Sequence, residues 1–419
     1  MDKRVVITGM GVISPVGNDI QTYWKNLCDG VCGIDFIDEF PTDDLPVRIA
    51  AKIKNFDPLL YGMDKQFARK QDLFTQFGMA AAWQAMQQSG LRTEGDEPNI
   101  DPFRLGVYVG SGIGGFSVQF RETAKMIEDP SGQWVSPLFI PTMISNIAAG
   151  NIAIKYQAQG PCLDIVTACA TSTNAIGEAF RTIKHGYADA IIAGGCENAT
   201  IPLGIAGFAN AKALSRATDP NYASLPFNAN RTGFVMGDGA GILVLEELEH
   251  AKARGARIIS EIVGYGNTCD AYHVTAPRPD GTTQAECIRI SLQEGGFEES
   301  KDTIYINAHG TGTRLNDTAE TIAYKVALGD YAYKAHISSI KSMTGHLLGA
   351  AGGAEAIATI LAVRDSICPP TINLDTPDPE CDLDYTPNKS VKADLTIGIS
   401  NSFGFGGHDA CIAFRNYHD

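Results

Sequence analysis

Short apolar runs alternate along this chain with longer segments of helical spacing, and this alternation is what most constrains the fold. The runs typical of strands form two series: residues 4–8, 105–110, 163–167, 189–194 and 241–246, then 258–264, 303–308, 336–340, 396–400 and 410–414. Segments in which apolar residues recur at helical spacing cover residues 20–28, 70–89, 171–185, 284–295, 317–328 and 350–364. Such an alternation predicts an α/β protein.

The two series resemble each other in order. The pairs of similar segments are 105–112 with 303–310, 163–185 with 336–364, and 189–195 with 396–407. We interpret this similarity as two related halves, residues 1–252 and 253–419.

The composition excludes some classes of function. The formal net charge of −15 argues against general nucleic-acid binding, which needs a basic surface. No stretch approaches the roughly 18 uncharged apolar residues of a membrane span. The N-terminal residues lead directly into a strand, so we expect no signal peptide. The ten cysteines are scattered without a zinc-binding pattern, which indicates reduced thiols in a cytoplasmic protein and no metal site.

Cys169 stands where an apolar run turns into a helical segment. Unpaired backbone N–H groups at a helix N-terminus favour a thiolate, so we expect a lowered pKa for this thiol. The neighbouring residues are small and leave room for a bulky acyl substrate. For a cysteine taken alone, the more common role is to fill a tight turn.

Two histidines follow strands of the second series. His309 begins the segment His-Gly-Thr-Gly-Thr after strand 303–308, and His346 lies after strand 336–340, close to Lys341. Taken singly, each histidine is more often a hydrogen-bonded structural residue. Their occurrence at two strand ends of one half, with Cys169 at a strand end of the other, predicts a site between the halves.

Two further features complete the set of candidates. A glycine-rich turn at residues 401–407 contains Phe403 and Phe405; it can aim a backbone N–H at a developing oxyanion, or it is an ordinary turn with buried aromatic rings. Basic side chains interrupt the acidic composition on one predicted helix and beyond it: Lys65, Arg69, Lys70, Lys212 and Arg216. They form either a solvated face or a surface for an acidic partner.

With these motifs in order from residues 5–11 to 405–407, the chain resembles the β-ketoacyl-acyl carrier protein synthases, in particular the synthase II group of fatty-acid elongation. The resemblance implies the thiolase fold, with two similar halves in five α-β-α-β-α layers, and a homodimer. It implies a decarboxylative Claisen condensation of malonyl-acyl carrier protein with an enzyme-bound acyl chain. No cofactor is then held by the enzyme itself, because the substrates are carried on the phosphopantetheine of acyl carrier protein.

The resemblance also implies roles for individual residues. Cys169 would take the acyl chain, and His309 and His346 would assist decarboxylation of the malonyl thioester. Lys341 would be the supporting cation and Glu355 its acidic partner.

Further residues are implied to bind substrate or to support the site. The N–H groups of Cys169 and Phe405 would form the oxyanion hole, and the Phe405 ring would be a gate. The remaining implied assignments are Thr311 and Thr313 for the phosphopantetheine arm, Phe403, Ile113 and Phe116 for the substrate pocket, Asp317 as a supporting residue, and Lys65, Arg69, Lys70 and Lys212 for carrier-protein docking.

Three other functions remain to be weighed. A polyketide ketosynthase shares these motifs, whereas a non-condensing chain-length partner subunit typically lacks the nucleophile that Cys169 provides. Gly9 and Gly11 invite a dinucleotide-binding interpretation, but Ser14 stands where the third glycine of that motif is needed. Two residues depart from the family pattern: Asp238 replaces the usual Glu, and Asp409 follows His408 where Asn is more common.

Overall fold

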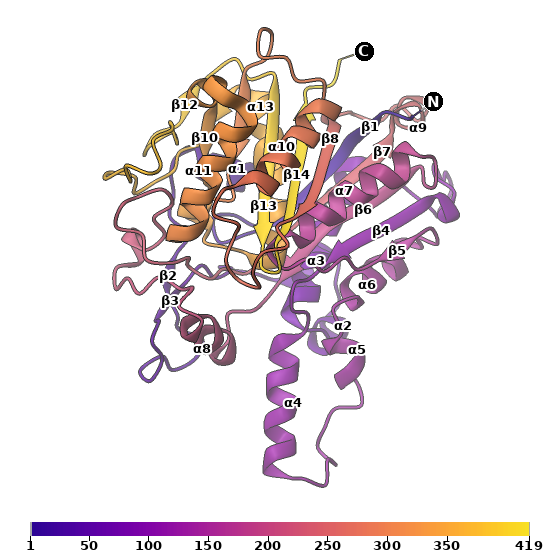
Figure 1. The fold of residues 1–419 in the computed structure, drawn as a ribbon. Coiled ribbons are helices and arrows are strands. Elements are labelled where there is room, and N and C mark those ends of the chain that lie inside the picture. Colours follow the sequence, from indigo (N-terminus) through magenta and orange to yellow (C-terminus); the bar gives the residue numbers. More distant parts are fainter. Residues whose placement is uncertain (1, 419) are drawn as a thin grey trace.

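A computed structural model describes residues 2–418, and its core is a ten-stranded sheet (Figure 1). The strand order is β10-β9-β13-β14-β8-β1-β7-β6-β4-β5. These strands are β1 (Val5–Ile13), β4 (Leu105–Gly110), β5 (Cys162–Leu163), β6 (Ala190–Glu197), β7 (Gly239–Glu247), β8 (Ser260–Cys269), β9 (Ile304–Asn307), β10 (His336–Ser338), β13 (Ile397–Gly404) and β14 (His408–Arg415). Two short pairs lie apart from it: β2 (Asp35–Phe36) with β3 (Ile49–Ala50), and β11 (Ile367–Cys368) with β12 (Val391–Lys392).

The two halves of the sheet repeat one topology. In β5-β4-β6-β7-β1 the first three strands are parallel and the last two are each antiparallel to their neighbour, and β10-β9-β13-β14-β8 has the same directions. The halves join where β1 pairs antiparallel with β8, over Val5–Ile7 and Ser260–Ile262. We propose that the boundary after residue 252 lies within helix α9 (Leu248–Ala253).

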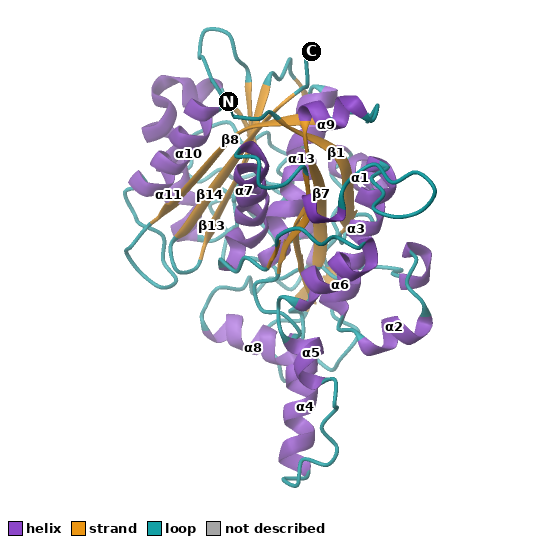
Figure 2. Ribbon diagram, turned by 90° about the vertical axis from the view of Figure 1, so that its right-hand side faces the viewer, coloured by secondary structure: helices purple, strands orange, loops and turns teal. Residues whose placement is uncertain are grey.

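Helices complete five layers, which Figure 2 shows from side to side. The outer layer on the first half contains α3 (Leu73–Ser89) and α6 (Ile147–Tyr156), and that on the second contains α10 (Thr282–Glu294) and α11 (Arg314–Leu328). Between the two halves lie α7 (Thr171–Lys184) and α13 (Ala351–Asp365), each contacting strands of both. The remaining α-helices are α1 (Ile20–Cys28), α2 (Lys65–Lys70), α4 (Phe116–Glu128), α5 (Phe139–Met143), α8 (Pro202–Asn210) and α12 (Lys341–Thr344).

The central position of α13 explains its sequence. Every residue from Ala351 to Val363 is buried, so the helix has no polar face. Small residues allow this close packing: a Cβ on Gly353 would lie 2.2 Å from the Gly241 carbonyl oxygen of β7. The sequence of this helix therefore suits an interior layer and not a surface one.

Two predicted elements need correction. The strand expected at 163–167 is limited to Cys162–Leu163, and its apolar residues are exposed, because β5 is the edge of the sheet. The turn expected at 401–407 is shorter, because β13 continues to Gly404 through backbone pairing with β14 and leaves only residues 405–407 in the turn. Helix α4, which the periodicity did not predict, projects from the body of the molecule (Figure 1).

Within residues 2–418, no helix combines the length and apolar character needed to cross a membrane. In the same range, no group of three or more His, Cys, Asp or Glu side chains is placed to hold a metal ion. All ten cysteines are free thiols.

Replacing Gly177 tests the packing of the central layer. Its Cβ in Gly177→Ala would lie 2.2 Å from a ring carbon of buried Tyr265, so α7 would have to move away from β8. We expect a loss of about 1–3 kcal/mol in the free energy of unfolding, measured by denaturant titration. Gly207→Ala in α8 is the matched control, since it meets nothing within 4 Å and should be neutral or stabilising. Equal effects of the two substitutions would contradict this account.

Candidate active site

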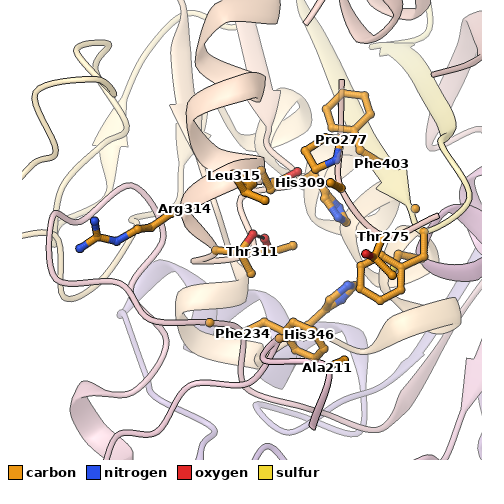
Figure 3. Close-up of a pocket in the computed structure, with 18 of the residues that line it drawn as sticks. Ala211, Phe234, Thr275, Pro277, His309, Thr311, Arg314, Leu315, His346 and Phe403 are labelled. Atoms are coloured by element: carbon orange, nitrogen blue, oxygen red, sulfur yellow. Dashed lines mark hydrogen bonds between the residues drawn. The ribbon is translucent and has the colours of Figure 1, made fainter. Parts of the chain in front are cut away.

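A cavity of about 500 Å³ opens where the two halves meet. Cys169 reaches it from the first half. His309, His346 and Phe403 reach it from the second half (Figure 3). The strand ends that the sequence indicated therefore converge on one cavity.

Cys169 lies in a strained turn, the 3-10 segment Ala168–Ala170 that precedes α7. Ala168 has a φ of 51°, a left-handed conformation that residues other than glycine rarely adopt. Side chains from both halves hold this turn. The side-chain amide of Asn174 donates to the Thr167 hydroxyl at 2.8 Å, and the Tyr265 hydroxyl of β8 donates to Oδ1 of Asn174 at 2.6 Å. Strain supported in this way is typical of functional sites.

The pKa of the Cys169 thiol is raised to about 11, mainly because burial disfavours the thiolate. The charge of Lys341 and a hydrogen bond from the Phe405 backbone oppose this effect without reversing it. The expected lowering of the pKa by the helix N-terminus is therefore wrong for this state, because desolvation outweighs it. The resting group is a thiol, which must lose its proton before it attacks a substrate.

His309 and His346 form a pair with ring centroids 5.3 Å apart. Burial and the nearby charge of Lys341 lower the pKa of both rings well below the usual value, so both are neutral. The backbone N–H of Leu348 donates to Nδ1 of His346 at 3.3 Å, which places the proton of this neutral ring on Nε2. His346 is therefore a hydrogen-bond donor through Nε2.

Lys341 supplies the positive charge behind this pair. The side chain is buried and its Nζ forms an ion pair with Glu355 Oε1 from α13. Burial raises the pKa of Glu355 while the Lys341 charge opposes the rise. A buried ion pair of this kind is costly to break, since either partner alone would leave an uncompensated charge.

The turn 405–407 touches the nucleophile. The backbone of Phe405 donates a hydrogen bond to the Cys169 sulfur. Gly404 makes this approach possible, because a Cβ there would lie 3.1 Å from the Cys169 nitrogen and 2.8 Å from the Thr167 oxygen. The Phe405 and Cys169 N–H groups are thus near enough to serve one oxyanion.

Two threonine hydroxyl groups line the cavity. Thr311 and Thr313 both face the cavity, with their oxygens 3.0 Å apart. Asp317 and Glu320 lie behind them: Asp317 accepts from the Gly312 N–H, and Glu320 accepts from the backbone of His309. These two carboxyl groups shape the histidine-bearing segment and do not line the cavity.

Some predicted site residues lie elsewhere. Ile113 is outside the lining of this cavity, and its N–H donates to Glu197, a buried carboxyl. Lys212 lines the cavity rim, but Lys65, Arg69 and Lys70 are exposed on α2, on the other side of α4 from α8 (Figures 1 and 2).

Sequence reasoning missed three polar residues that build the site. Glu197 accepts hydrogen bonds from the backbone of Gly112 and Gly349, so it links the two halves. Arg231 is buried at the cavity wall and pairs with Asp317. Asn174 holds the Cys169 turn. Asn174 could have been found from the sequence because it follows Cys169 closely. Glu197 and Arg231 are far from the motifs along the chain, and no spacing rule would have identified them.

Comparisons with known proteins agree with this architecture. Residues 2–251 match the family described as "Beta-ketoacyl synthase, N-terminal domain", and residues 259–375 match its "C-terminal domain". The chain is 49% identical over 417 residues to "3-oxoacyl-[acyl-carrier-protein] synthase 2" of Synechocystis sp., covering 99% of this chain and 98% of the relative. It is 48% identical over 416 residues to the protein of the same description from Staphylococcus aureus, covering 99% of both chains.

Solved structures give the same result. A β-ketoacyl synthase from Burkholderia phymatum superposes with a TM-score of 0.90 at 34% identity, covering 99% of this chain and 100% of the other. A type II polyketide ketosynthase, solved with its acyl-carrier protein, also superposes with a TM-score of 0.90. It is 32% identical to this chain, and both chains are covered completely. With one cysteine and two histidines lining the same cavity of a thiolase-like fold, and with these full-length relatives, the chain belongs to the β-ketoacyl synthase family.

Proposed function

We propose that this chain is a condensing enzyme of fatty-acid elongation, a β-ketoacyl-acyl carrier protein synthase. It joins malonyl-acyl carrier protein to an acyl chain held on Cys169, giving 3-oxoacyl-acyl carrier protein and CO₂. The observation that carries the proposal is the convergence of one thiol and two neutral histidines at the junction of the halves.

The first half-reaction is acyl transfer to sulfur. The Cys169 thiolate attacks the thioester carbonyl of the acyl carrier, a C–S bond forms, and the carrier thiol leaves with the proton that Cys169 gave up. The N–H groups of Cys169 and Phe405 stabilise the oxyanion of the tetrahedral intermediate.

The second half-reaction needs hydrogen-bond donors and not a strong base. Malonyl thioester loses CO₂, and the electron pair of the broken C–C bond becomes an enolate. His309 and His346 donate to the enolate oxygen, and neutral imidazoles in a desolvated site suit this role. The enolate carbon then attacks the acyl thioester, and the Cys169 thiolate leaves.

Thr311 and Thr313 are proposed to hold the phosphopantetheine arm of the carrier, since their hydroxyls line the cavity. Phe403 forms part of the cavity wall beside His309, and the centroids of the two rings are 5.9 Å apart. Phe405 remains a proposed gate. Ile113, which lies outside this cavity beside Glu197, remains a proposed contact for the acyl chain beyond it. The enzyme itself is proposed to need no further cofactor.

Acyl carrier protein is the proposed partner. A related ketosynthase has been solved in complex with its acyl-carrier protein. Lys212 at the cavity rim is placed to meet an acidic carrier. We propose that Lys65, Arg69 and Lys70, which lie on the other side of α4, are further docking residues for the carrier. Polyketide synthesis is the second candidate, favoured by the fold of the polyketide ketosynthase at 32% identity. The relatives at 48–49% identity are named for the acyl-carrier-protein synthase 2 activity, which favours elongation.

We also propose a homodimer formed through the edge strand β5. Leu163 and Val166 are each 49% exposed, although the sequence of this segment is typical of a buried strand. Trp134 and Ile140, from the hairpin of α4 and α5, are exposed as well. A second copy pairing across β5 would cover these residues and continue the sheet, which removes an unprotected edge.

The ten free thiols support a reducing compartment, and we propose the cytoplasm.

Intact-mass analysis tests the nucleophile. Incubation with acyl carrier protein that bears a fatty-acyl thioester should add one acyl group to the protein, and Cys169→Ser should abolish this addition. Because the pKa of this thiol is raised to about 11, the acylation rate should increase about tenfold between pH 6 and pH 7, in proportion to the thiolate. Cys269 is an exposed thiol near the turn 405–407, and the control variant Cys269→Ser should still be acylated on Cys169 at the normal rate. Acylation of the Cys169→Ser protein would overturn the assignment.

Separate assays distinguish the histidines from the nucleophile. His309→Ala and His346→Ala should each reduce CO₂ release from malonyl-acyl carrier protein at least about a hundredfold, since each removes a donor to the enolate. Acylation of Cys169 should be affected less. His273→Ala, an exposed histidine at the rim of the same cavity, is the control. Near-normal CO₂ release in either buried-histidine variant would refute the donor role.

Light scattering during gel filtration tests the dimer. Val166→Glu would place a charge in the proposed interface, and we expect the mass to fall from two chains to one. Val391→Glu, at an exposed valine of β12 in the second half, should leave the dimer intact. A dimeric Val166→Glu protein, or a monomeric wild type, would disprove an interface at β5.

A further inference from the structure

Two carboxyl side chains meet beneath the turn 405–407. Asp409 is the second residue of β14, and Asp270 directly follows β8. Both are buried, both line the active-site cavity, and they lie at hydrogen-bonding distance from each other.

The hydrogen bonds around the pair indicate which carboxyl is charged. Asp270 accepts from the backbone N–H of Arg278 at 2.9 Å and from the hydroxyl of Thr283, as a carboxylate does. The single hydroxyl proton of Thr268 has two acceptors within reach, the Thr283 carbonyl at 2.8 Å and Asp409 Oδ2 at 3.2 Å. The Thr283 hydroxyl is within reach of both carboxyls and donates to Asp270. When Thr268 donates to the nearer oxygen, neither hydroxyl is left to donate to Asp409, which then supplies a proton itself.

The charged groups around the pair leave Asp409 uncompensated. Among residues 2–418, no Lys or Arg side chain forms an ion pair with either carboxyl. The Arg278 guanidinium binds Asp280 and acts on Asp270 through its charge without a direct contact. From α10 and β14, the thiols of Cys287 and Cys411 face this region, and burial raises the pKa of both. Burial, followed by the charge of Asp270, raises the pKa of Asp409 to about 8.

The pair is in direct contact with the catalytic turn. The backbone N–H of Asp270 donates to the Gly407 carbonyl at 2.8 Å, and a Cβ on Gly407 would lie 2.8 Å from the Asp270 Cβ. Gly406 donates to the Val274 carbonyl at 2.7 Å, on the segment that Asp270 begins. In this arrangement the Phe405 N–H meets the sulfur of Cys169.

We propose that Asp409 and Asp270 share one proton, and that this bond holds the turn 405–407 where the Phe405 N–H reaches Cys169. Loss of that proton to solvent through the cavity leaves two adjacent carboxylates under the turn. Their repulsion separates Asp270 from β14, and Asp270 carries Gly407 and Phe405 with it. Asp409 is therefore a positioning residue that makes acylation of Cys169 dependent on pH.

The acylation rate of Asp409→Asn, divided by that of the wild type at the same pH, tests this role. The titration of Cys169 affects both rates equally and cancels in this ratio. The neutral amide mimics the protonated carboxyl at every pH. We expect the ratio of acylation rates to rise about tenfold between pH 7 and pH 9, since a group with a pKa of about 8 is mostly protonated at the first pH and mostly ionised at the second. Asp280→Asn, an exposed carboxyl in the same segment, should give a constant ratio. A constant ratio for Asp409→Asn would overturn the proposal.

A second measurement needs no enzymatic activity, so it separates this inference from the proposed function on which it rests. The infrared difference spectrum of the wild type minus Asp409→Asn at pH 6 should contain a protonated carboxylic acid band that disappears near pH 8. Buried Glu197 and Glu320, whose pKa values burial raises to about 7, are present in both proteins and cancel in the difference. In thermal unfolding the folded state binds the extra proton, so wild-type stability should fall more steeply than that of the variant as pH rises from about 4 to about 8. Absence of the band from the difference spectrum would disprove the shared proton.

Discussion

Close contact between the N-terminal ends of α7 and α13 fixes the geometry of the site. A Cβ on Gly352 would lie 2.0 Å from the Thr173 hydroxyl oxygen, and Ser172 donates directly to the Gly349 carbonyl. The nucleophile and His346 each lie just before one of these helices, so the distance between them is set by the packing of small residues in the central layer. The sheets, the outer helices and the buried polar groups keep these two helices in place.

Desolvation is the second constraint, and it acts in opposite directions on the two kinds of catalytic group. It keeps the histidines neutral, which is the state in which an imidazole N–H can donate while its other nitrogen accepts. It also disfavours the thiolate of Cys169. Lys341 offsets part of that cost, and its own charge is neutralised by Glu355, so the site gains a positive field without a net charge.

The sequence was sufficient for the order of the main elements and for the convergence of Cys169, His309 and His346, because each follows a predicted strand of the sheet. It was not sufficient for the electrostatics. A local pattern shows that a helix N-terminus is near Cys169, but not how deeply the sulfur is buried, and burial decides the pKa. Likewise, the exposure of Val166 depends on the edge position of β5, which only the sheet order reveals.

The strained turn before α7 has a counterpart before α13. Ala168 has a φ of 51° and Leu348 a φ of 50°, each opening a 3-10 segment that leads into a central helix. Cys169 therefore corresponds to Gly349, and by the order of the strands His309 corresponds to Ser111. In evolutionary terms, the backbone of the nucleophile turn is retained in both halves while the reactive side chains are divided between them. Neither half carries a complete set of reactive side chains, so neither half could form the site without the other.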